Sequence, residues 1–117
     1  MITYILMYAT ENGLQFYCHK YSMEDKFVKV EFDLQCKWEG FPPDYRIYVN
    51  DELMTERTYN YGSHQYIKEM LQILAKPGEY VIKIEKVGPQ SAEYTINNTY
   101  IKLGPGEIID NTRFRIL

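Results

Sequence analysis

The most constraining feature of the sequence is a strict alternation of apolar and polar residues along positions 27–38. Every second position is apolar, and this set comprises Val28, Val30, Phe32, Leu34, Cys36 and Trp38. The positions between them hold Lys29, Glu31, Asp33, Gln35 and Lys37. Successive side chains of a strand point to opposite faces of a sheet, so this pattern predicts a long strand with one buried face. An antiparallel sheet that is half exposed is typical of such strands.

Residues 44–58 have the pattern of a β-hairpin. Tyr45, Ile47 and Val49 alternate with polar or amphipathic residues, and a second alternating stretch follows at positions 52–58. Asn50 and Asp51 stand between the two stretches. Both residue types tolerate the positive backbone angles of a type I′ turn, so a tight turn is predicted there.

Five further stretches are predicted strands from their alternation and their flanking turn residues: 1–9, 14–20, 79–87, 93–103 and 108–117. Asn12-Gly13 between the first two predicts a hairpin. Within residues 93–103 the apolar residues change phase, which predicts a bulge near Asn97 and Asn98.

Residues 66–75 fit two patterns. Ile67, Met70, Leu71 and Leu74 have helical spacing, with Ser63 as a possible cap, yet Ile67, Glu69, Leu71 and Ile73 also alternate. We predict a strand, because Lys76-Pro77-Gly78 makes a compact turn before the next strand. The alternative is a helix.

Together these stretches give about nine short strands, with turns roughly every ten residues. That count is typical of an all-β fold, an antiparallel β-sandwich of jelly-roll type. A chain of 117 residues suits one domain with one core, so we expect a single domain spanning residues 1–117.

Charge and motifs exclude several classes of function. A formal net charge of −3 provides no basic surface for phosphates, so we expect no nucleic-acid partner. The apolar start at residues 1–9 is too short to span a bilayer and lacks the features of a signal peptide, so we expect no membrane association. Phosphate-binding loops, nucleophile elbows and Cys/His catalytic pairs are missing from the sequence, so we expect neither an enzyme nor a cofactor.

The cysteine and histidine residues do not form a metal-binding motif. The spacing of Cys18 and Cys36 matches no zinc or redox site, so each is expected to pack as a small apolar residue. His19 and His64 are isolated from each other, and no metal site is expected at either.

The sequence contains 12 tyrosines, and several fall in residues 59–66, a stretch with loop composition. Aromatic rings stack on sugar rings or on apolar patches of a partner, while neighbouring polar side chains supply hydrogen bonds. The candidate contact residues are Tyr59, Tyr61, His64 and Tyr66. The alternative is that these tyrosines only cover one end of the sandwich.

The order of motifs from residue 44 to residue 103 resembles two known families. Its parts are Arg46-Ile47-Tyr48-Val49-Asn50-Asp51-Glu52-Leu53, then Lys76-Pro77-Gly78-Glu79-Tyr80-Val81-Ile82-Lys83-Ile84, and then Tyr94-Thr95-Ile96-Asn97-Asn98. It is similar to small jelly-roll carbohydrate-binding modules of the calcium-dependent xylan-binding type, and to small β-sandwich proteins of tailed-phage particles. The first family holds calcium with acidic residues in a late loop, whereas residues 87–91 contain none, so no calcium is expected.

The second resemblance implies a non-catalytic structural or interaction protein of a bacteriophage virion, associated with a head, tail or fibre. Its partners would be other copies of itself or a larger virion protein. The alternative is a carbohydrate-binding module, cytoplasmic or extracellular, that recognises a polysaccharide through the Tyr-rich loop.

Overall fold

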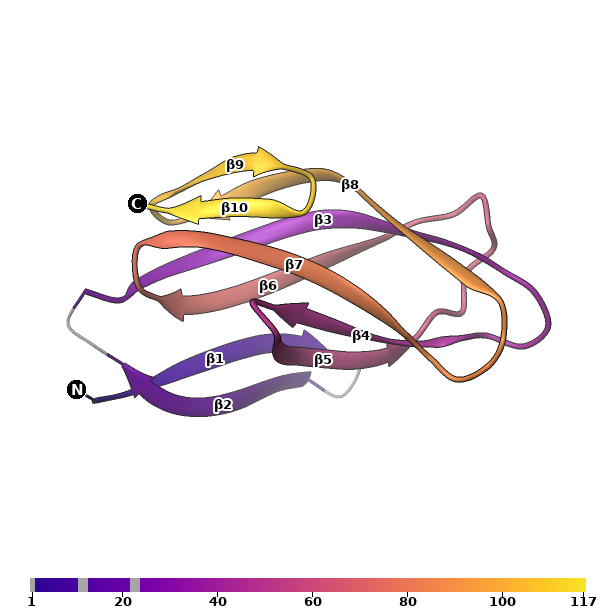
Figure 1. Ribbon diagram of the computed structural model, residues 1–117, viewed down its shortest axis with the longest axis horizontal. Helices are drawn as coiled ribbons and strands as arrows, with labels where there is room; N and C mark the ends of the chain where they lie inside the picture. The colour runs from indigo at the N-terminus through magenta and orange to yellow at the C-terminus, as the bar shows by residue number, and fades with distance from the viewer. Residues whose placement is uncertain (1, 11–12, 22–23) are drawn as a thin grey trace.

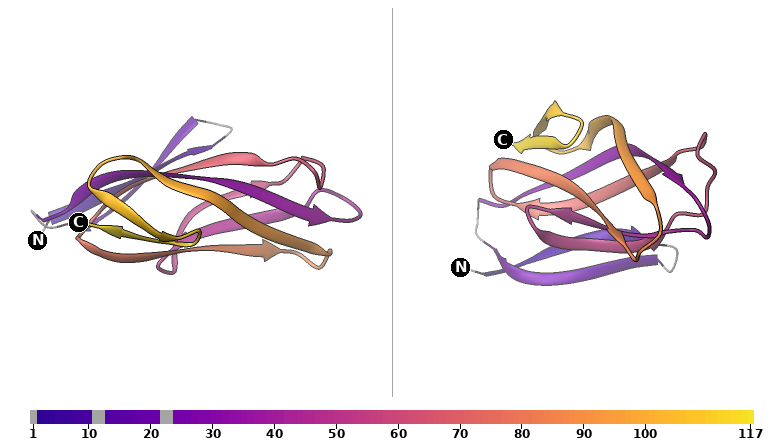
Figure 2. Two further views of the ribbon diagram at one scale, coloured as in Figure 1. Left: turned by 90° about the horizontal axis from the view of Figure 1, so that it is seen from above. Right: turned by 45° about the vertical axis from the view of Figure 1, so that its right-hand side comes forward.

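The computed structural model describes residues 2–10, 13–21 and 24–117, with side chains from residue 24 onward. Ten antiparallel strands form two five-stranded sheets that face each other in an elongated sandwich, 47 × 25 × 22 Å (Figures 1 and 2). The prediction of an all-β antiparallel sandwich is confirmed. The strand count is ten rather than about nine.

Each sheet mixes neighbouring and distant parts of the chain. The first sheet has the order β2-β1-β6-β3-β8, with bounds β1 Ile2–Thr10, β2 Gly13–Tyr21, β3 Lys26–Trp38, β6 Ile67–Ala75 and β8 Ala92–Leu103. The second has the order β5-β4-β7-β10-β9, with bounds β4 Asp44–Val49, β5 Glu52–Thr58, β7 Gly78–Val87, β9 Gly106–Asp110 and β10 Arg113–Ile116. Within the described part of the chain, no helix has the length and apolarity needed to cross a membrane.

Strand β3 supplies the centre of the core. Its five apolar residues from Val28 to Cys36 have no exposed surface, as the alternation predicted. They pack against the inner faces of β4, β7 and β10, which contribute Tyr45, Ile47, Val49, Ile82, Phe114 and Ile116. β3 is also the strand between β6 and β8, so both of its edges are paired.

The hairpin predicted at residues 44–58 is confirmed as β4 and β5. Asn50 and Asp51 have φ angles of 47° and 66°, which are the positive values that a type I′ turn requires. The pairing between β4 and β5 shifts register after Ile47, so the hairpin contains one irregularity.

The ambiguous segment at residues 66–75 forms strand β6, as predicted. It pairs with β3 without interruption, from Ile67 opposite Leu34 to Ala75 opposite Lys26. Leu71 and Ile73 are buried in the core, which a strand achieves with alternate residues. Tertiary pairing therefore prevails over the helical spacing of the same residues.

One predicted strand is wrong. Residues 108–117 do not form a single strand, because β9 and β10 make a hairpin that turns at residues 111–112. The Asp110 carboxylate stabilises this turn by accepting hydrogen bonds from the Thr112 amide (3.0 Å) and from Nε of Arg113 (2.8 Å). Asp and Asn residues favour such turns without any glycine or proline, so the sequence carries no glycine or proline to mark this break.

The predicted N-terminal hairpin is present as β1 and β2, which pair from Ile2 opposite Tyr21 to Thr10 opposite Gly13. The turn itself includes residues 11–12, and these lie outside the described residues. Cys36 is fully buried, as expected of a cysteine that packs as an apolar residue. The side chains of Cys18 and His19 lie outside the described part of the structure.

Candidate ligand-binding site

The loop between β5 and β6 is anchored by Tyr59. Its side chain has no exposed surface, and its hydroxyl donates to the carbonyl oxygens of Leu34 (3.3 Å) and Gln65 (2.9 Å). Its amide donates to the carbonyl oxygen of Pro43 at 2.9 Å. The ring makes edge contacts with neighbouring tyrosines, including Tyr45 at a centroid distance of 6.4 Å. Tyr59 was predicted to contact a ligand, but its side chain is buried here, and its hydrogen bonds hold the loop.

Further hydrogen bonds fasten this loop to β3. Nε1 of Trp38 donates to the carbonyl oxygen of Tyr61 at 2.7 Å, and Nε2 of Gln35 donates to that of Ser63 at 2.8 Å. A small ring of bonds closes the loop, because the Gly62 amide donates to Oε1 of Gln65 (2.8 Å) and the Gln65 amide donates to the Gly62 carbonyl (3.0 Å). These hydrogen bonds hold residues 59–65 in place, and Tyr66 follows directly after this fixed segment.

Tyr66 lines two separate hollows in the surface. Its side chain is 61% exposed, a large value for an aromatic residue in a folded domain. The first hollow has a volume of about 340 Å³ and is also lined by Arg57, Thr58, Tyr61, Ile67, Lys68 and Glu69. The second has a volume of about 300 Å³ and is also lined by Asp33, Gln35, Asn97 and Asn98. Tyr61 and Tyr66 of the predicted set therefore meet at one site.

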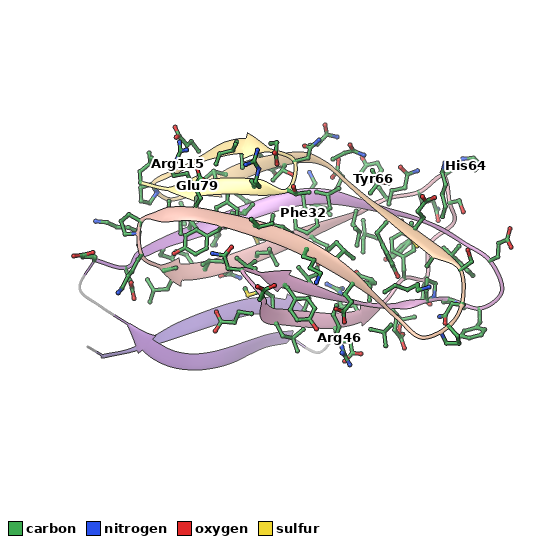
Figure 3. All side chains as sticks on the ribbon, in the orientation of Figure 1. Phe32, Arg46, His64, Tyr66, Glu79 and Arg115 are labelled. Atoms are coloured by element: carbon green, nitrogen blue, oxygen red, sulfur yellow. The ribbon has the colours of Figure 1, made fainter. Side chains whose placement is uncertain are left out.

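His64, the fourth predicted residue, is exposed but lines neither hollow. Figure 3 shows it at the same end of the molecule as Tyr66 but closer to the tip of that end. Of the predicted contact set, the structure thus brings together two tyrosines, buries a third and leaves the histidine apart.

The second hollow lies over the outer face of β3 and β8, where the predicted bulge is found. Asp33 pairs with Asn97 and Glu31 pairs with Tyr100, so β8 has an extra residue in this interval. Asn98 has a φ angle of 53°, and its Nδ2 donates to Oδ2 of Asp33 at 2.9 Å. The hollow therefore offers one carboxylate and several side-chain amides beside an aromatic ring.

The first hollow contains a buried ion pair. Glu69 is 2% exposed, and its carboxylate accepts hydrogen bonds from the Tyr45 hydroxyl (2.7 Å) and from Nη1 of Arg57 (3.3 Å). Burial raises the pKa of the Glu69 carboxyl, and this effect outweighs the opposing hydrogen bond from Tyr45 and the charge of Arg57. These three groups satisfy one another, so a ligand would meet mainly Tyr61, Thr58 and Lys68 in this hollow.

A second exposed aromatic lies on the outer face of the same sheet. Tyr100 is 40% exposed and donates from its hydroxyl to Oε1 of Glu31 at 2.7 Å, and this bond lowers the pKa of Glu31. Nζ of Lys68 lies over the Tyr100 ring, 5.5 Å from its centroid, and Nζ of Lys102 lies 3.3 Å from Oε1 of Glu31. The face thus combines aromatic rings with charged groups that already have partners.

Sequence reasoning missed the polar half of this site. Asp33 and Gln35 have the outward positions of β3, and nothing in a single strand shows which residues of β8 lie beside them. The bulge predicted at Asn97 and Asn98 was the available signal, because bulges often place side chains at functional sites. Within the described residues, no group of three or more His, Cys, Asp or Glu side chains is placed to hold a metal ion.

No protein-family model, curated protein or solved structure matches this chain.

Proposed function

We propose that this protein is a non-catalytic binding module that recognises a polysaccharide across the face around Tyr66. The observation that supports this proposal is the position of Tyr66, an exposed ring with a polar hollow on each side. A sugar ring stacks its C–H face on an aromatic side chain while its hydroxyl groups need hydrogen-bond partners at the edges. Both requirements are met here, since Asp33 and Asn98 lie on one side and Thr58 and Lys68 lie on the other.

The shape of the site favours a chain over a single sugar. Both hollows are open to solvent and Tyr66 is the one residue that lines both, so a ligand that fills both would contact the Tyr66 ring. An extended oligosaccharide does this, with one residue stacked on the ring and its neighbours in the hollows. Carboxylate and amide side chains supply both acceptors and donors, which suits the hydroxyl groups of a neutral glycan.

The direct test is binding of the purified chain to a panel of immobilised polysaccharides, together with the variant Tyr66→Ala. We expect binding to one class of glycan and a loss of about five- to thirtyfold in affinity in the variant, because a stacked aromatic contributes roughly 1 to 2 kcal/mol. The melting temperature should stay close to that of the wild type, since Tyr66 is largely exposed.

Phe41→Ala is the matched control. Phe41 is 63% exposed, close to the 61% of Tyr66, but it lines neither hollow. Its removal should leave glycan binding unchanged. Silence across the whole panel, or an equal effect of the two substitutions, would reject the glycan proposal.

The second candidate function is assembly into a larger particle, as a virion component that associates with copies of itself or with a larger virion protein. The supporting observation is strand β2 at the edge of its sheet. The pairings of the other edge strands, β5, β8 and β9, all contain register shifts, whereas β2 pairs with β1 along nine residues without one. Bulges blunt an edge against further pairing, so β2 is the edge best suited to accept another strand.

Among the described residues, the hairpin that carries β2 pairs with the rest of its sheet at two positions, where Met7 and Tyr8 lie opposite Gln72 and Leu71. Figure 2 shows it leaving the layer of the sandwich. Sedimentation of the full chain over a range of concentrations tests this candidate, with amide hydrogen exchange of β2 followed in parallel. Association should slow exchange in β2, while a monomer with unchanged exchange at every concentration would count against assembly through this edge.

A further inference from the structure

Strand β7 is paired along only part of one edge. On the side facing away from β4, residues 78–81 pair with β10, and the amide of Ile82 donates to the carbonyl oxygen of Thr112 at 2.7 Å. From Lys83 to Val87, no strand in the described part of the chain pairs with β7 on that side. Figure 1 shows the β9–β10 hairpin lying beside the left half of β7 only.

The direction of the backbone groups along this open edge follows from their neighbours. The Val81 amide donates toward β4, to Oδ1 of Asn50 (2.8 Å), while the Ile82 amide donates toward β10. Backbone groups of successive strand residues point to alternate edges. Ile84 and Lys86 therefore present their N–H and C=O groups along the open edge, and such a row of groups is a template for an added strand.

A groove with an apolar floor lies next to this edge. It has a volume of about 450 Å³ and runs between β7 and β8, which is itself the edge strand of the other sheet. Its apolar lining consists of Ile82, Ile84, Ala92, Tyr94 and Ile96. These residues belong to the core or pack against it, so the groove opens directly onto the interior of the sandwich.

The groove is also lined by three charged side chains, those of Lys83, Lys86 and Glu93, which together give it a net positive charge. Lys86 lines it, and the position of Lys86 opposite the buried Tyr45 in β4 places it on the inner side of the sheet. Within the described residues Lys86 takes part in no ion pair. An occupant that carries a carboxylate at the facing position would supply one.

We propose that this groove binds a short extended segment of a partner protein, which pairs with β7 as an added strand beyond the first residue of β10. The segment has apolar residues at alternate positions, which cover the groove floor, and an acidic residue that faces Lys86. The open edge of β7 lies next to β10 in the same sheet, so the added strand would extend that existing sheet. Peptide recognition by strand addition obtains affinity from main-chain hydrogen bonds and specificity from alternate side chains.

This inference does not depend on the glycan proposal. Tyr94 and Ile96 belong to the inner face of β8, whereas Asn97 borders the hollow beside Tyr66 on the outer face. Tyr66→Ala is therefore a control that should leave peptide binding intact while removing glycan binding.

The test begins with selection of a random dodecapeptide display library on the full-length protein. We expect enrichment of peptides with alternating apolar residues and at least one Asp or Glu. A labelled peptide from this set should bind the wild type, and Lys86→Glu should weaken it by about tenfold or more by reversing the facing charge. Ala92→Arg, which places a long side chain in the groove, should abolish binding. Lys86→Glu should keep the melting temperature of the wild type, because Lys86 is exposed. Ala92 packs against the core, so Ala92→Arg is measured below its own melting temperature, and Lys86→Glu carries the test if that variant fails to fold.

Amide hydrogen exchange locates the contact. Bound peptide should protect Ile84 and Lys86, the residues whose backbone groups face the open edge. Failure to enrich peptides, enrichment of peptides without acidic residues, or binding that survives both substitutions would overturn the proposal. If Ile84 and Lys86 became protected with rising protein concentration alone, a second copy would be the occupant, and the peptide proposal would be wrong.

Discussion

The hydroxyl group of Tyr45 donates a 2.7 Å hydrogen bond to Oε1 of Glu69, and this bond joins the two sheets inside the core. Tyr45 belongs to β4 in one sheet and Glu69 belongs to β6 in the other. Arg57 at the end of β5 adds an ion pair to the same carboxylate. Charge buried at the junction of two sheets makes the stability of the sandwich depend on pH in a defined direction.

We expect the Glu69 carboxyl to favour the folded state most at acidic pH. Burial raises its pKa in the folded protein, so the folded state holds this proton at pH values where the unfolded chain has lost it. The resulting stability is present below the pKa of an unfolded Glu, about 4.3, and is lost as pH rises through the higher folded value. The free energy of unfolding of wild type minus that of Glu69→Gln should therefore fall as pH rises, which urea titrations from pH 4 to 7 would show. A constant difference would contradict it.

Glu31→Gln should show the opposite sign and serves as the companion measurement. The hydrogen bond from Tyr100 lowers the pKa of Glu31, so the stability it contributes is present above the unfolded pKa and is lost as pH falls through the lower folded value. The same urea titrations, extended to lower pH, should show that the free energy of unfolding of the wild type minus that of Glu31→Gln decreases as pH falls. Two variants that changed in the same direction would show that these assignments are wrong.

Tyr59 should behave as a core residue despite its place in a loop. Tyr59→Ala removes a fully buried ring and should lower the free energy of unfolding by about 3 to 5 kcal/mol. Tyr59→Phe keeps the ring but loses the hydroxyl bonds to Leu34 and Gln65, so a loss of about 1 kcal/mol is expected. Denaturant unfolding measures both. If Tyr59→Ala cost no more than Tyr59→Phe, the ring would not be packed as described.

Gly104 and Gly40 provide a matched pair that separates backbone strain from collision. Both have positive φ angles, 94° and 86°. An added Cβ at Gly104 would collide with the carbonyl oxygen of Phe27, whereas at Gly40 it would meet nothing within 4 Å. Gly40→Ala should cost about 1 kcal/mol from backbone strain, and Gly104→Ala should cost at least about 2 kcal/mol more. Equal costs in thermal unfolding would mean that the β8–β9 turn is not held tightly against β3.

The turn between β4 and β5 allows a stabilising substitution. Asp51 has a φ angle of 66°, a conformation that glycine adopts without steric cost, so Asp51→Gly should raise the free energy of unfolding by about 0.5 kcal/mol. Asn50→Gly has the same backbone advantage but loses side-chain bonds to the Val81 amide and to the Glu79 carbonyl. It should therefore lower stability by about 1 kcal/mol. The opposite order in denaturant midpoints would contradict the turn geometry.

Sequence patterns predicted the strands whose signals are local. The alternation of β3, the Asn50-Asp51 turn and the phase change at Asn97 each arise within about a dozen residues, and each is present in the structure. The break at residues 111–112 was missed because the apolar positions on either side, such as Ile108 and Phe114, read as one alternating strand. Turns made by Asp side chains lack the glycine or proline that marks most other breaks in this chain.

The tyrosines of the candidate site could be predicted from the sequence, but its polar residues could not. Tyr61 and Tyr66 belong to one short Tyr-rich stretch, and composition alone predicted both as contact residues. Asp33 and Asn98 come together only because β3 pairs with a strand more than fifty residues later, and a single sequence does not reveal that register. Composition also could not separate the buried Tyr59 from the exposed Tyr66, since both belong to the same Tyr-rich stretch.

The central place of β3 has a consequence for synthesis of the chain. Its two partners, β6 and β8, follow it in the sequence by long intervals, so a nascent β3 leaves the ribosome well before anything can pair with its edges. A purely apolar strand in that position would aggregate. Charged or polar residues at every second position, from Lys29 to Lys37, keep one side of the unpaired strand soluble until β8 emerges.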